Sequence, residues 1–160
     1  MKFLSLKPAI AIALINTFLP VTMVSCAKED NVDGRWKEYP LSAIGASGVT
    51  GKVRFTENTD RSFNVLVTLN KSVKDTVHLV NILHGTTTNP GAVAIALSNI
   101  PGTGNLASSE TKNIRQMKLP DNSMKNINYD SIIKFTGHVN ALYSTTRSDS
   151  SLAKGNIGTN

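Results

Sequence analysis

Four residues of this 160-residue chain have side chains that commonly carry chemistry in proteins. They are one cysteine, Cys26, and three histidines, His78, His84 and His138. Histidine is the commonest ligand of transition metals, and a metal site on a β scaffold typically gathers three or four such ligands from neighbouring strands. The histidines are therefore weak candidates for a copper or zinc site, and the cysteine is a candidate for covalent modification.

The spacing of the histidines argues against a shared metal ion. His78 and His84 would face the same side of a regular strand, but they would lie roughly 20 Å apart and could not chelate one ion without a sharp bend. His138 follows Gly137 at the start of a late strand and can approach the others only through the tertiary fold. We therefore expect three unrelated polar or capping histidines, and no resident metal or cofactor.

The sequence contains none of the common catalytic signatures. It has no Gly-x-Ser-x-Gly motif, and Gly102-Thr103-Gly104 lacks the strand-to-helix context of a phosphate-binding loop. The acidic residues are scattered through turn-like segments and form no spaced pairs that could act as general acid and base. A non-catalytic role is therefore the first expectation.

Cys26 follows an N-terminal stretch that is typical of an export signal. Lys2 and Lys7 give a positive start, and residues 8–24 are almost entirely apolar but are interrupted by polar and proline positions. A membrane-spanning helix needs ~20 continuous apolar residues, which this stretch does not supply. Residues 1–25 are therefore predicted to be a signal peptide; an uncleaved anchor and a cleaved signal beside an incidental cysteine are the alternatives.

The segment Met23-Val24-Ser25-Cys26 resembles a bacterial lipobox, in which the cysteine thiol is acylated and the cysteine becomes the new N-terminus. Acylation also suits an exported chain with one cysteine, which cannot form an internal disulfide. Each buried CH₂ group of an acyl chain contributes ~0.8 kcal/mol to membrane binding. The resemblance implies lipidation (palmitate-type) at Cys26 and an outer-membrane location, facing the periplasm or the cell surface.

The charge of the chain gives no indication of a nucleic-acid partner. The formal net charge is +6, and removal of Lys2 and Lys7 with the signal peptide leaves about +4. The basic residues are spread along the chain, without the cluster and interleaved aromatic residues that nucleic-acid binding requires. The membrane, through the lipid anchor, is the expected partner instead.

Residues 26–46 are predicted to form the lipidated N-terminus and a tether with a lead-in strand, and residues 47–160 to form the domain. Trp36 and Tyr39 make an aromatic patch near the tether that either contacts a partner or covers one end of the domain. The Lys28-Glu29-Asp30 run resembles a signal for export to the cell surface; a solvated linker is the other interpretation.

The domain has the alternating pattern of β-strands. Residues 62–70 place Phe63, Val65, Val67 and Leu69 on one face, and residues 53–55 alternate in the same way before a turn at residues 57–60. Further strands are expected over residues 76–83, 92–97, 111–119, 137–144 and 152–157, and one helical turn over residues 129–134. Strands punctuated by turns predict an all-β, antiparallel sandwich or barrel.

Residues 78–85 and 89–97 resemble the central motif of CHRD domains, the chordin-type module, in which a strand carrying His-x-His-Gly precedes a Gly-Pro-rich loop and an apolar strand. Residues 128–142 and 151–158 are similar to the short helix and final strands of that family and of the related copper/zinc superoxide dismutases. The resemblance covers roughly residues 47–158, which is most of the chain after the predicted signal peptide. It implies a Greek-key-like sandwich or flattened barrel of about seven or eight strands.

The chain departs from the dismutase pattern at the metal ligands. The alternating partner of His84 is Ile82, and the late-strand ligand position falls at Leu142 or Tyr143. The structural cysteine of that pattern corresponds to Lys154. Because a copper centre needs several ligands, the resemblance implies a dismutase-like shape from which most of the ligands are missing.

The sequence thus predicts a lipid-anchored, non-catalytic β-sandwich that binds or displays a partner at the bacterial outer membrane. The partner can be an envelope protein or a glycan. The alternative is a metal-binding protein or enzyme of copper/zinc dismutase type that uses His84 with His78 or His138. An accessory subunit of a surface complex is a third possibility, with Trp36 and Tyr39 as its contacts.

Overall fold

The structure is a computed structural model that describes residues 34–159. The predicted signal segment, Cys26 and the first part of the predicted tether lie outside the described residues. Within residues 34–159, no helix is long and apolar enough to cross a membrane.

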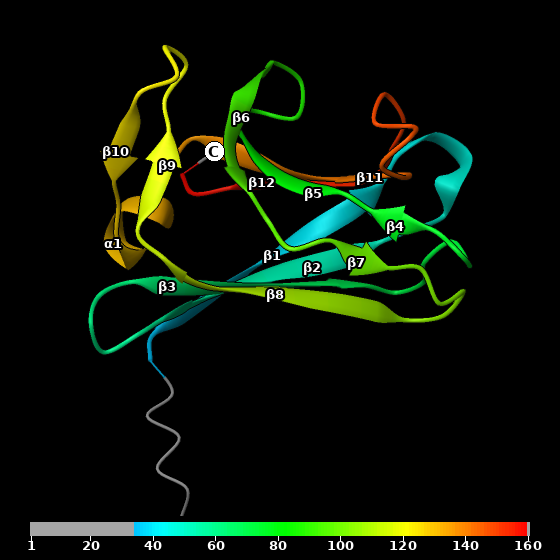
Figure 1. The fold of residues 1–160 in the computed structure, drawn as a ribbon, viewed down its shortest axis with the longest axis horizontal. Helices are drawn as coiled ribbons and strands as arrows, with labels where there is room; N and C mark the ends of the chain where they lie inside the picture. Colours follow the sequence, from blue (N-terminus) through cyan, green and yellow to red (C-terminus); the bar gives the residue numbers. More distant parts are fainter. Residues whose placement is uncertain (1–33, 160) are drawn as a thin grey trace, which may run out of the picture. The chain divides into compact units, whose positions relative to one another are not determined.

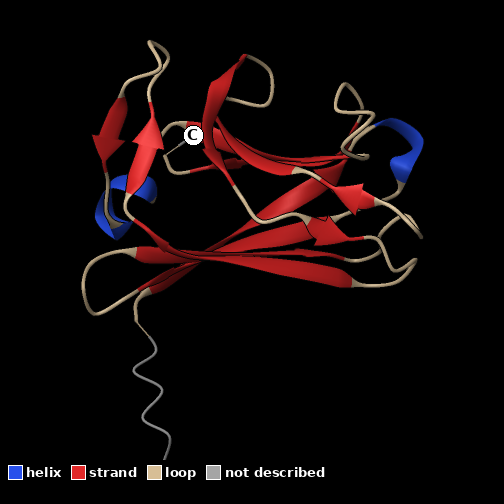
Figure 2. Cartoon of the chain, viewed as in Figure 1, coloured by secondary structure: helices blue, strands red, loops and turns tan. Residues whose placement is uncertain are grey.

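The regular secondary structure of the described chain is β, apart from two short helical segments (Figure 2). Its main sheet has eight antiparallel strands. In spatial order these are β6 (Pro90–Ala96), β5 (Val80–Gly85), β11 (Gly137–Leu142), β12 (Ser151–Ile157), β1 (Trp36–Ala43), β2 (Gly51–Glu57), β3 (Phe63–Leu69) and β8 (Ala107–Ile114). The all-β, antiparallel prediction is confirmed.

Four short strands and two helical turns complete the described fold. β9 (Gln116–Lys118) pairs with β10 (Met124–Asn126), and β4 (Val77–His78) pairs with β7 (Ile100–Pro101). Helix α1 (Tyr129–Ile132) lies within the predicted helical turn and begins at Asn128, whose side chain accepts a hydrogen bond from the Ser131 N–H. A 3₁₀ turn, η1 (Gly45–Ser47), joins β1 to β2.

The main sheet curls into a half-barrel (Figure 1). β5, β11 and β12 form one wall, β2, β3 and β8 form the facing wall, and β1 crosses between them. β12 approaches β1 very closely, because a Cβ added to Gly155 would lie 2.0 Å from the Pro40 carbonyl oxygen. The glycine therefore permits the contact that joins the two walls.

The core fills the space between the two walls. Phe63, Val65, Val67 and Leu69 of β3 are all almost completely buried, as their alternation predicts. Across the core, the facing wall contributes residues that are also buried: Val80, Ile82, Val139, Ala141, Ala153 and Ile157. The inner face of the sheet is thus continuous and apolar.

The prediction of one strand over residues 76–83 is wrong. The structure divides this segment at Leu79 into β4, which pairs with β7, and β5, which pairs with β6 and β11. The two halves follow different partners, so the chain cannot remain one regular strand. His78 is consequently buried beside β7, whereas His84 lies near the end of β5.

The prediction of one strand over residues 111–119 is also wrong. β8 ends at Ile114, and β9 begins at Gln116. Asn113 has a φ of 57°, in the left-handed region, so the extended conformation is interrupted there. β9 leaves the main sheet and pairs with β10 instead.

The folded domain begins earlier than the predicted boundary at residue 47. β1 spans Trp36–Ala43, pairs with β2 over six residue pairs and also pairs with β12. Leu41 of β1 is buried in the core. Residues 36–46, predicted as the end of the tether with a lead-in strand, therefore contain a central strand of the sheet.

Candidate functional site

His78 is a buried bridge between two loops rather than a free metal ligand. Its Nε2 accepts a hydrogen bond from the Val73 N–H at 3.0 Å, and its Nδ1 lies 2.6 Å from the Tyr143 carbonyl oxygen. A carbonyl oxygen can only accept, so Nδ1 carries the hydrogen and the Nε2 lone pair is already used. The side chain is fully buried and joins the loop before β4 to the loop after β11.

His84 is held at the end of β5 by a different set of contacts. Its Nε2 lies 2.8 Å from the Lys118 carbonyl oxygen on β9, to which it donates. Its ring packs edge-on against the ring of Phe135 at 5.2 Å between centroids. His84 thus fastens the β9–β10 ribbon to the main sheet.

His138 is fully buried on the outer side of β11. Its Nδ1 lies 2.9 Å from the carbonyl oxygen of Gly85, to which it donates, and its Nε2 has no hydrogen-bond partner among residues 34–159. The loop after β5 covers this region, because the Thr87 N–H donates to the Asn156 side-chain oxygen at 2.8 Å. His138 therefore supports the loop between β5 and β6.

The structure does not bring the histidines together. Gly137 is the partner of His84 across β11 and β5, so His138, the next residue, points to the opposite face of the sheet. His78 lies on the separate β4–β7 ribbon. Among the described residues, no group of three or more His, Cys, Asp or Glu side chains is placed to hold one metal ion.

The residues at the positions that the dismutase resemblance would assign to metal ligands and to the structural cysteine pack or pair within the sheet. Ile82 is completely buried in the core opposite Val139, and Leu142 is buried at the end of β11. Tyr143 packs partly buried against the core. Lys154 lies on β12, paired with Asn140 of β11.

Trp36 and Tyr39, the predicted aromatic patch, separate into two environments. Tyr39 packs edge-on against Phe55 at 5.9 Å and belongs to the core margin. Trp36 is 56% exposed on the outer face of β1, where the guanidinium of Arg54 lies 4.7 Å from its ring centroid. Only Trp36 is therefore available as an aromatic contact.

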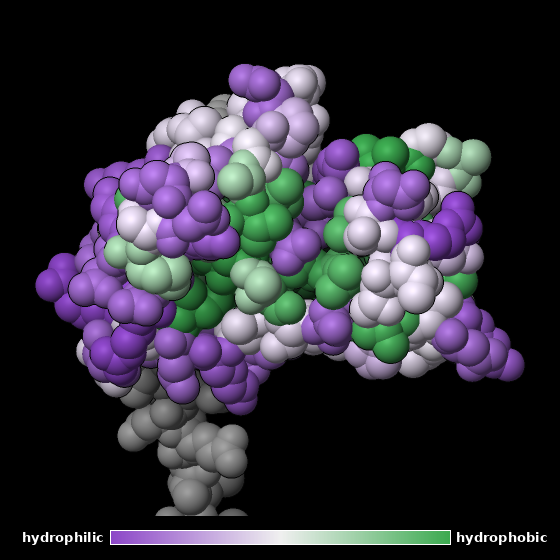
Figure 3. All heavy atoms as spheres, turned by 45° about the horizontal axis from the view of Figure 1, so that its top comes forward, coloured by the Kyte–Doolittle hydropathy of each residue, from purple (hydrophilic) through white to green (hydrophobic). Residues whose placement is uncertain are grey.

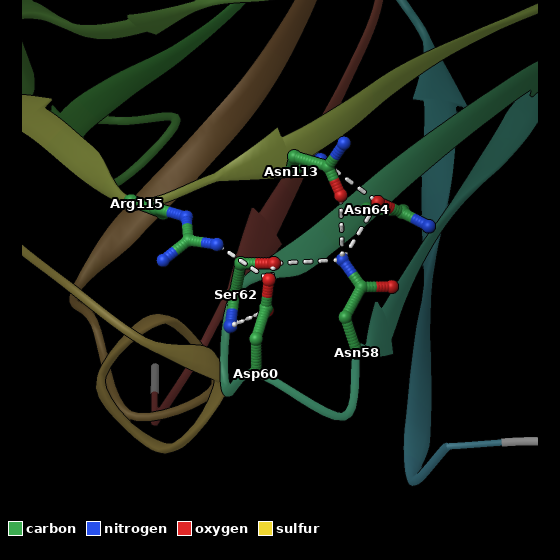
Figure 4. Close-up of polar contacts among 6 residues, drawn as sticks. All are labelled: Asn58, Asp60, Ser62, Asn64, Asn113 and Arg115. Carbon is green, nitrogen blue, oxygen red and sulfur yellow. Dashed lines mark hydrogen bonds and ion pairs between the residues drawn. The ribbon is translucent and has the colours of Figure 1, made fainter.

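A polar network closes the end of the domain where the described chain begins (Figure 4). The Asn58 side-chain amide donates to oxygens of Ser62, Asn64 and Asn113 at 2.9, 3.0 and 3.3 Å. The Asn113 N–H also donates to the Asn64 side-chain oxygen at 2.9 Å. These contacts join the β2–β3 turn to β8 at the irregular residue Asn113, and they stabilise the turn.

Carboxylates near this turn are held in their charged form. Asp60 accepts hydrogen bonds from the Ser62 hydroxyl and N–H and pairs with Arg115, and these contacts lower the pKa of Asp60. The Arg35 guanidinium donates to both oxygens of Glu57, at 2.7 and 2.9 Å, which lowers the pKa of Glu57. The turn therefore depends on ionised carboxylates.

The Arg35–Glu57 pair predicts a loss of stability in acid. A carboxylate with a lowered pKa in the folded state stabilises the protein above its ordinary pKa, about 4.5 for Glu57, and this contribution is lost as the pH falls below it. Thermal unfolding of wild type and Glu57→Gln between pH 7 and pH 3 should show a lower Tm for the variant at pH 7. The difference should shrink toward pH 3.

Glu110→Gln is the matched control for this prediction, because Glu110 pairs with Lys112 on the exposed surface, where an ion pair contributes little to stability. A Tm difference between wild type and Glu57→Gln that stays constant from pH 7 to pH 3 would contradict the role given to the pair.

An apolar groove lies where the half-barrel stays open, between β6 and the β9–β10 ribbon. Ala92, Val93 and Ile95 of β6 line one side, and Leu119 and Met124 line the other. Figure 3 shows apolar surface gathered in a hollow at the centre of this face, with hydrophilic side chains around it. The curled sheet does not close into a full barrel, because its two end strands, β6 and β8, do not pair with each other.

A second groove, of about 600 Å³, lies at the end of the domain that contains η1. It is lined by residues from four segments that are far apart in the sequence: Ile44, Ala46, Ser47 and Val49; Lys71, Ser72 and Val73; Gly104; and Tyr143, Arg147, Ser150, Ser151 and Leu152. No acidic residue is among its lining residues. We call it the basic groove, after Lys71 and Arg147.

Hydrogen bonds fix the walls of the basic groove. His78 connects Val73 on one wall with Tyr143 on the other. The Ser72 hydroxyl donates to the Asn105 carbonyl oxygen at 2.9 Å and so holds the segment that carries Lys71. The groove is therefore a built feature of the fold rather than a gap between loose loops.

Sequence reasoning did not identify the basic groove. Lys71 and Arg147 lie in separate loops, and no spacing within either loop marks them as partners. The residue type of His78 makes it a weak candidate metal ligand, whereas in the structure it lies between the groove walls. The local sequence carries no signal for the groove, because Asp75 lies four residues after Lys71 and Asp149 lies two residues after Arg147.

Comparison with known proteins does not extend these observations. No protein-family model, no curated protein and no solved structure matches the chain.

Proposed function

We propose that this chain is a lipid-anchored, non-catalytic binding module of the bacterial outer membrane, attached through Cys26 and carrying its binding site in the basic groove. The observation that carries the proposal is that the start of β1 and the basic groove lie at opposite ends of the domain. The described chain begins beside the β2–β3 turn, where the Glu57 N–H donates to the Arg35 carbonyl oxygen at 2.8 Å.

From that end, β1 runs across the domain to η1, which lines the basic groove (Figure 1). A strand of eight residues spans about 26 Å. The chain therefore enters β1 at the end of the domain opposite the groove. This arrangement supports a module that is held at one end and binds at the other.

The surroundings of the histidines support a binding role over the copper/zinc dismutase alternative. That alternative would use His84 with His78 or His138. His78 already uses both ring nitrogens, and His84 and His138 point to opposite faces of the sheet. The resemblance to CHRD domains stays a prediction about the family.

Replacement of Cys26 with serine is expected to abolish lipidation, because a hydroxyl does not form the thioether that the lipobox resemblance implies. The variant should incorporate no labelled palmitate and should move from the membrane fraction to the soluble fraction, since two or three acyl chains supply the membrane affinity. The measurement is metabolic labelling followed by fractionation of the cells.

Ser42→Ala, an exposed change on β1, is the control and should be labelled and retained like wild type. A Cys26→Ser protein that stays in the membrane after an alkaline wash would instead indicate an uncleaved N-terminal anchor, and the proposed attachment would be wrong.

A further inference from the structure

Five of the fourteen lysines and arginines in residues 34–159 form ion pairs with carboxylates, and the two cations of the basic groove are among the nine that form none. Arg35, Lys52, Arg54, Lys112 and Arg115 each form an ion pair with a carboxylate. Within the part of the chain that the structure describes, neither Lys71 nor Arg147 forms one. Asp75 lines an adjoining hollow with Arg147, but it does not line the groove itself. The groove thus offers positive charge with no acidic residue along its lining.

The Arg147 side chain is held by its surroundings, whereas Lys71 is exposed and lies over a glycine. The Arg147 guanidinium lies 4.5 Å from the ring centroid of Tyr143, and the Arg147 N–H donates to the Ser144 hydroxyl at 3.0 Å. A stacked guanidinium is positioned for an oxyanion and loses little freedom on binding. Lys71 extends over Gly48, where an added Cβ would lie 3.5 Å from the Lys71 Nζ.

The rest of the lining indicates what else a ligand would carry. The hydroxyls of Ser150 and Ser151 make no hydrogen bond to residues 34–159, so they are free to bind hydroxyl groups of a ligand. Val49, Val73 and Leu152 supply an apolar part of the wall. A volume of about 600 Å³ is within the range of small-molecule sites.

We propose that the basic groove binds a small hydroxylated organic anion, such as a sugar phosphate or a sugar acid, with Lys71 and Arg147 contacting the anionic group. This inference rests on the proposed function, because it names the ligand class of the same groove. Charge complementarity selects an anion, and the free hydroxyls together with the apolar wall select a sugar-like body over a bare ion.

The test is calorimetric titration of the mature, lipidated protein in a non-ionic detergent at low salt. The probes are glucose 1-phosphate, glucuronate, glucose and inorganic phosphate. We expect binding of at least one of the two anionic sugars, and at least tenfold weaker binding of both glucose and inorganic phosphate. Comparison of glucose 1-phosphate with glucuronate identifies which anionic group the groove prefers.

Lys71→Ala and Arg147→Ala should each weaken the binding by about tenfold, because each removes one charged contact. Lys125→Ala removes an exposed lysine on β10, away from the groove, and should leave the affinity unchanged. Arg147→Lys keeps the charge and loses the stacked, forked geometry, so its affinity should lie between those of wild type and Arg147→Ala.

Three outcomes would overturn the proposal: no binding of either anionic sugar at millimolar concentration, binding of inorganic phosphate as tight as that of the sugars, or an equal loss in Lys125→Ala. These outcomes are distinct from failure of the proposed anchoring, which is measured by acylation and membrane retention of the same variants.

Discussion

Replacement of Gly155 with alanine is expected to lower the free energy of unfolding by about 3 kcal/mol, because it forces a methyl group into the contact between β12 and β1. An added Cβ would lie 2.0 Å from the Pro40 carbonyl oxygen and 2.9 Å from a methyl carbon of Leu41. The oxygen belongs to the backbone, so it cannot move aside as a flexible side chain could. Relief requires the two walls of the half-barrel to separate.

Thermal or urea unfolding of the full-length protein measures this effect, and a loss of about 3 kcal/mol corresponds to a fall in Tm of roughly 10 °C. Ser42→Ala is the control, since Ser42 lies on β1 in the same strand pair, opposite Lys154, but is exposed. A Gly155→Ala protein as stable as the control would mean that β12 and β1 approach less closely than the structure shows.

The sequence predicts strands best where one face of the strand is buried in the core and the other face is closer to solvent. β3 is such a strand, because Phe63 and Val65 alternate with less apolar neighbours. Alternation did not predict β1 as part of the folded domain. Its residues include Pro40 and two charged residues, Lys37 and Glu38, and only its pairing with both β2 and β12 makes it central.

The division of a predicted strand into two shorter strands could not be predicted from the local alternation of residues either. Residues 76–83 remain extended on both sides of Leu79, yet the two parts pair with different strands. The tertiary fold decides which strand another strand pairs with. Alternation of apolar and polar residues therefore predicts which side chains of a strand face the core, but it does not predict the neighbouring strand.

The candidate site was less predictable than the fold. Lys71 and Arg147 have no spacing relation in the sequence, and a lone lysine or arginine in a loop indicates only a solvated surface. The histidines are candidate metal ligands from their residue type alone. One of them, His78, does bear on the groove, but through hydrogen bonds to backbone atoms of Val73 and Tyr143 rather than through metal ligation.

Replacement of His78 with alanine is therefore the second change from which we expect a large effect. It leaves the Val73 N–H and the Tyr143 carbonyl oxygen without their present partner and empties a fully buried volume. An unsatisfied buried polar group costs about 1–3 kcal/mol, and the cavity adds to this, so we expect a loss of about 3 kcal/mol in the free energy of unfolding.

His84→Ala is the matched control, because His84 makes one carbonyl hydrogen bond and one ring contact at the other end of β5 and is only partly buried. It should destabilise the protein less and should leave binding at the groove unchanged. Equal effects of the two substitutions on stability and on binding would mean that His78 has no particular role in the groove.

A merely structural role for His78 is separated from a positioning role by the conservative variant His78→Gln. Glutamine offers one donor and one acceptor at the end of its side chain, so it can reach both backbone partners when the loops adjust slightly. At a temperature where both variants are folded, His78→Gln should recover part of the glucose 1-phosphate affinity that His78→Ala loses. A folded His78→Ala protein that binds as tightly as wild type would limit the role of His78 to folding, since Tyr143, which packs against Arg147, would then be placed correctly without it.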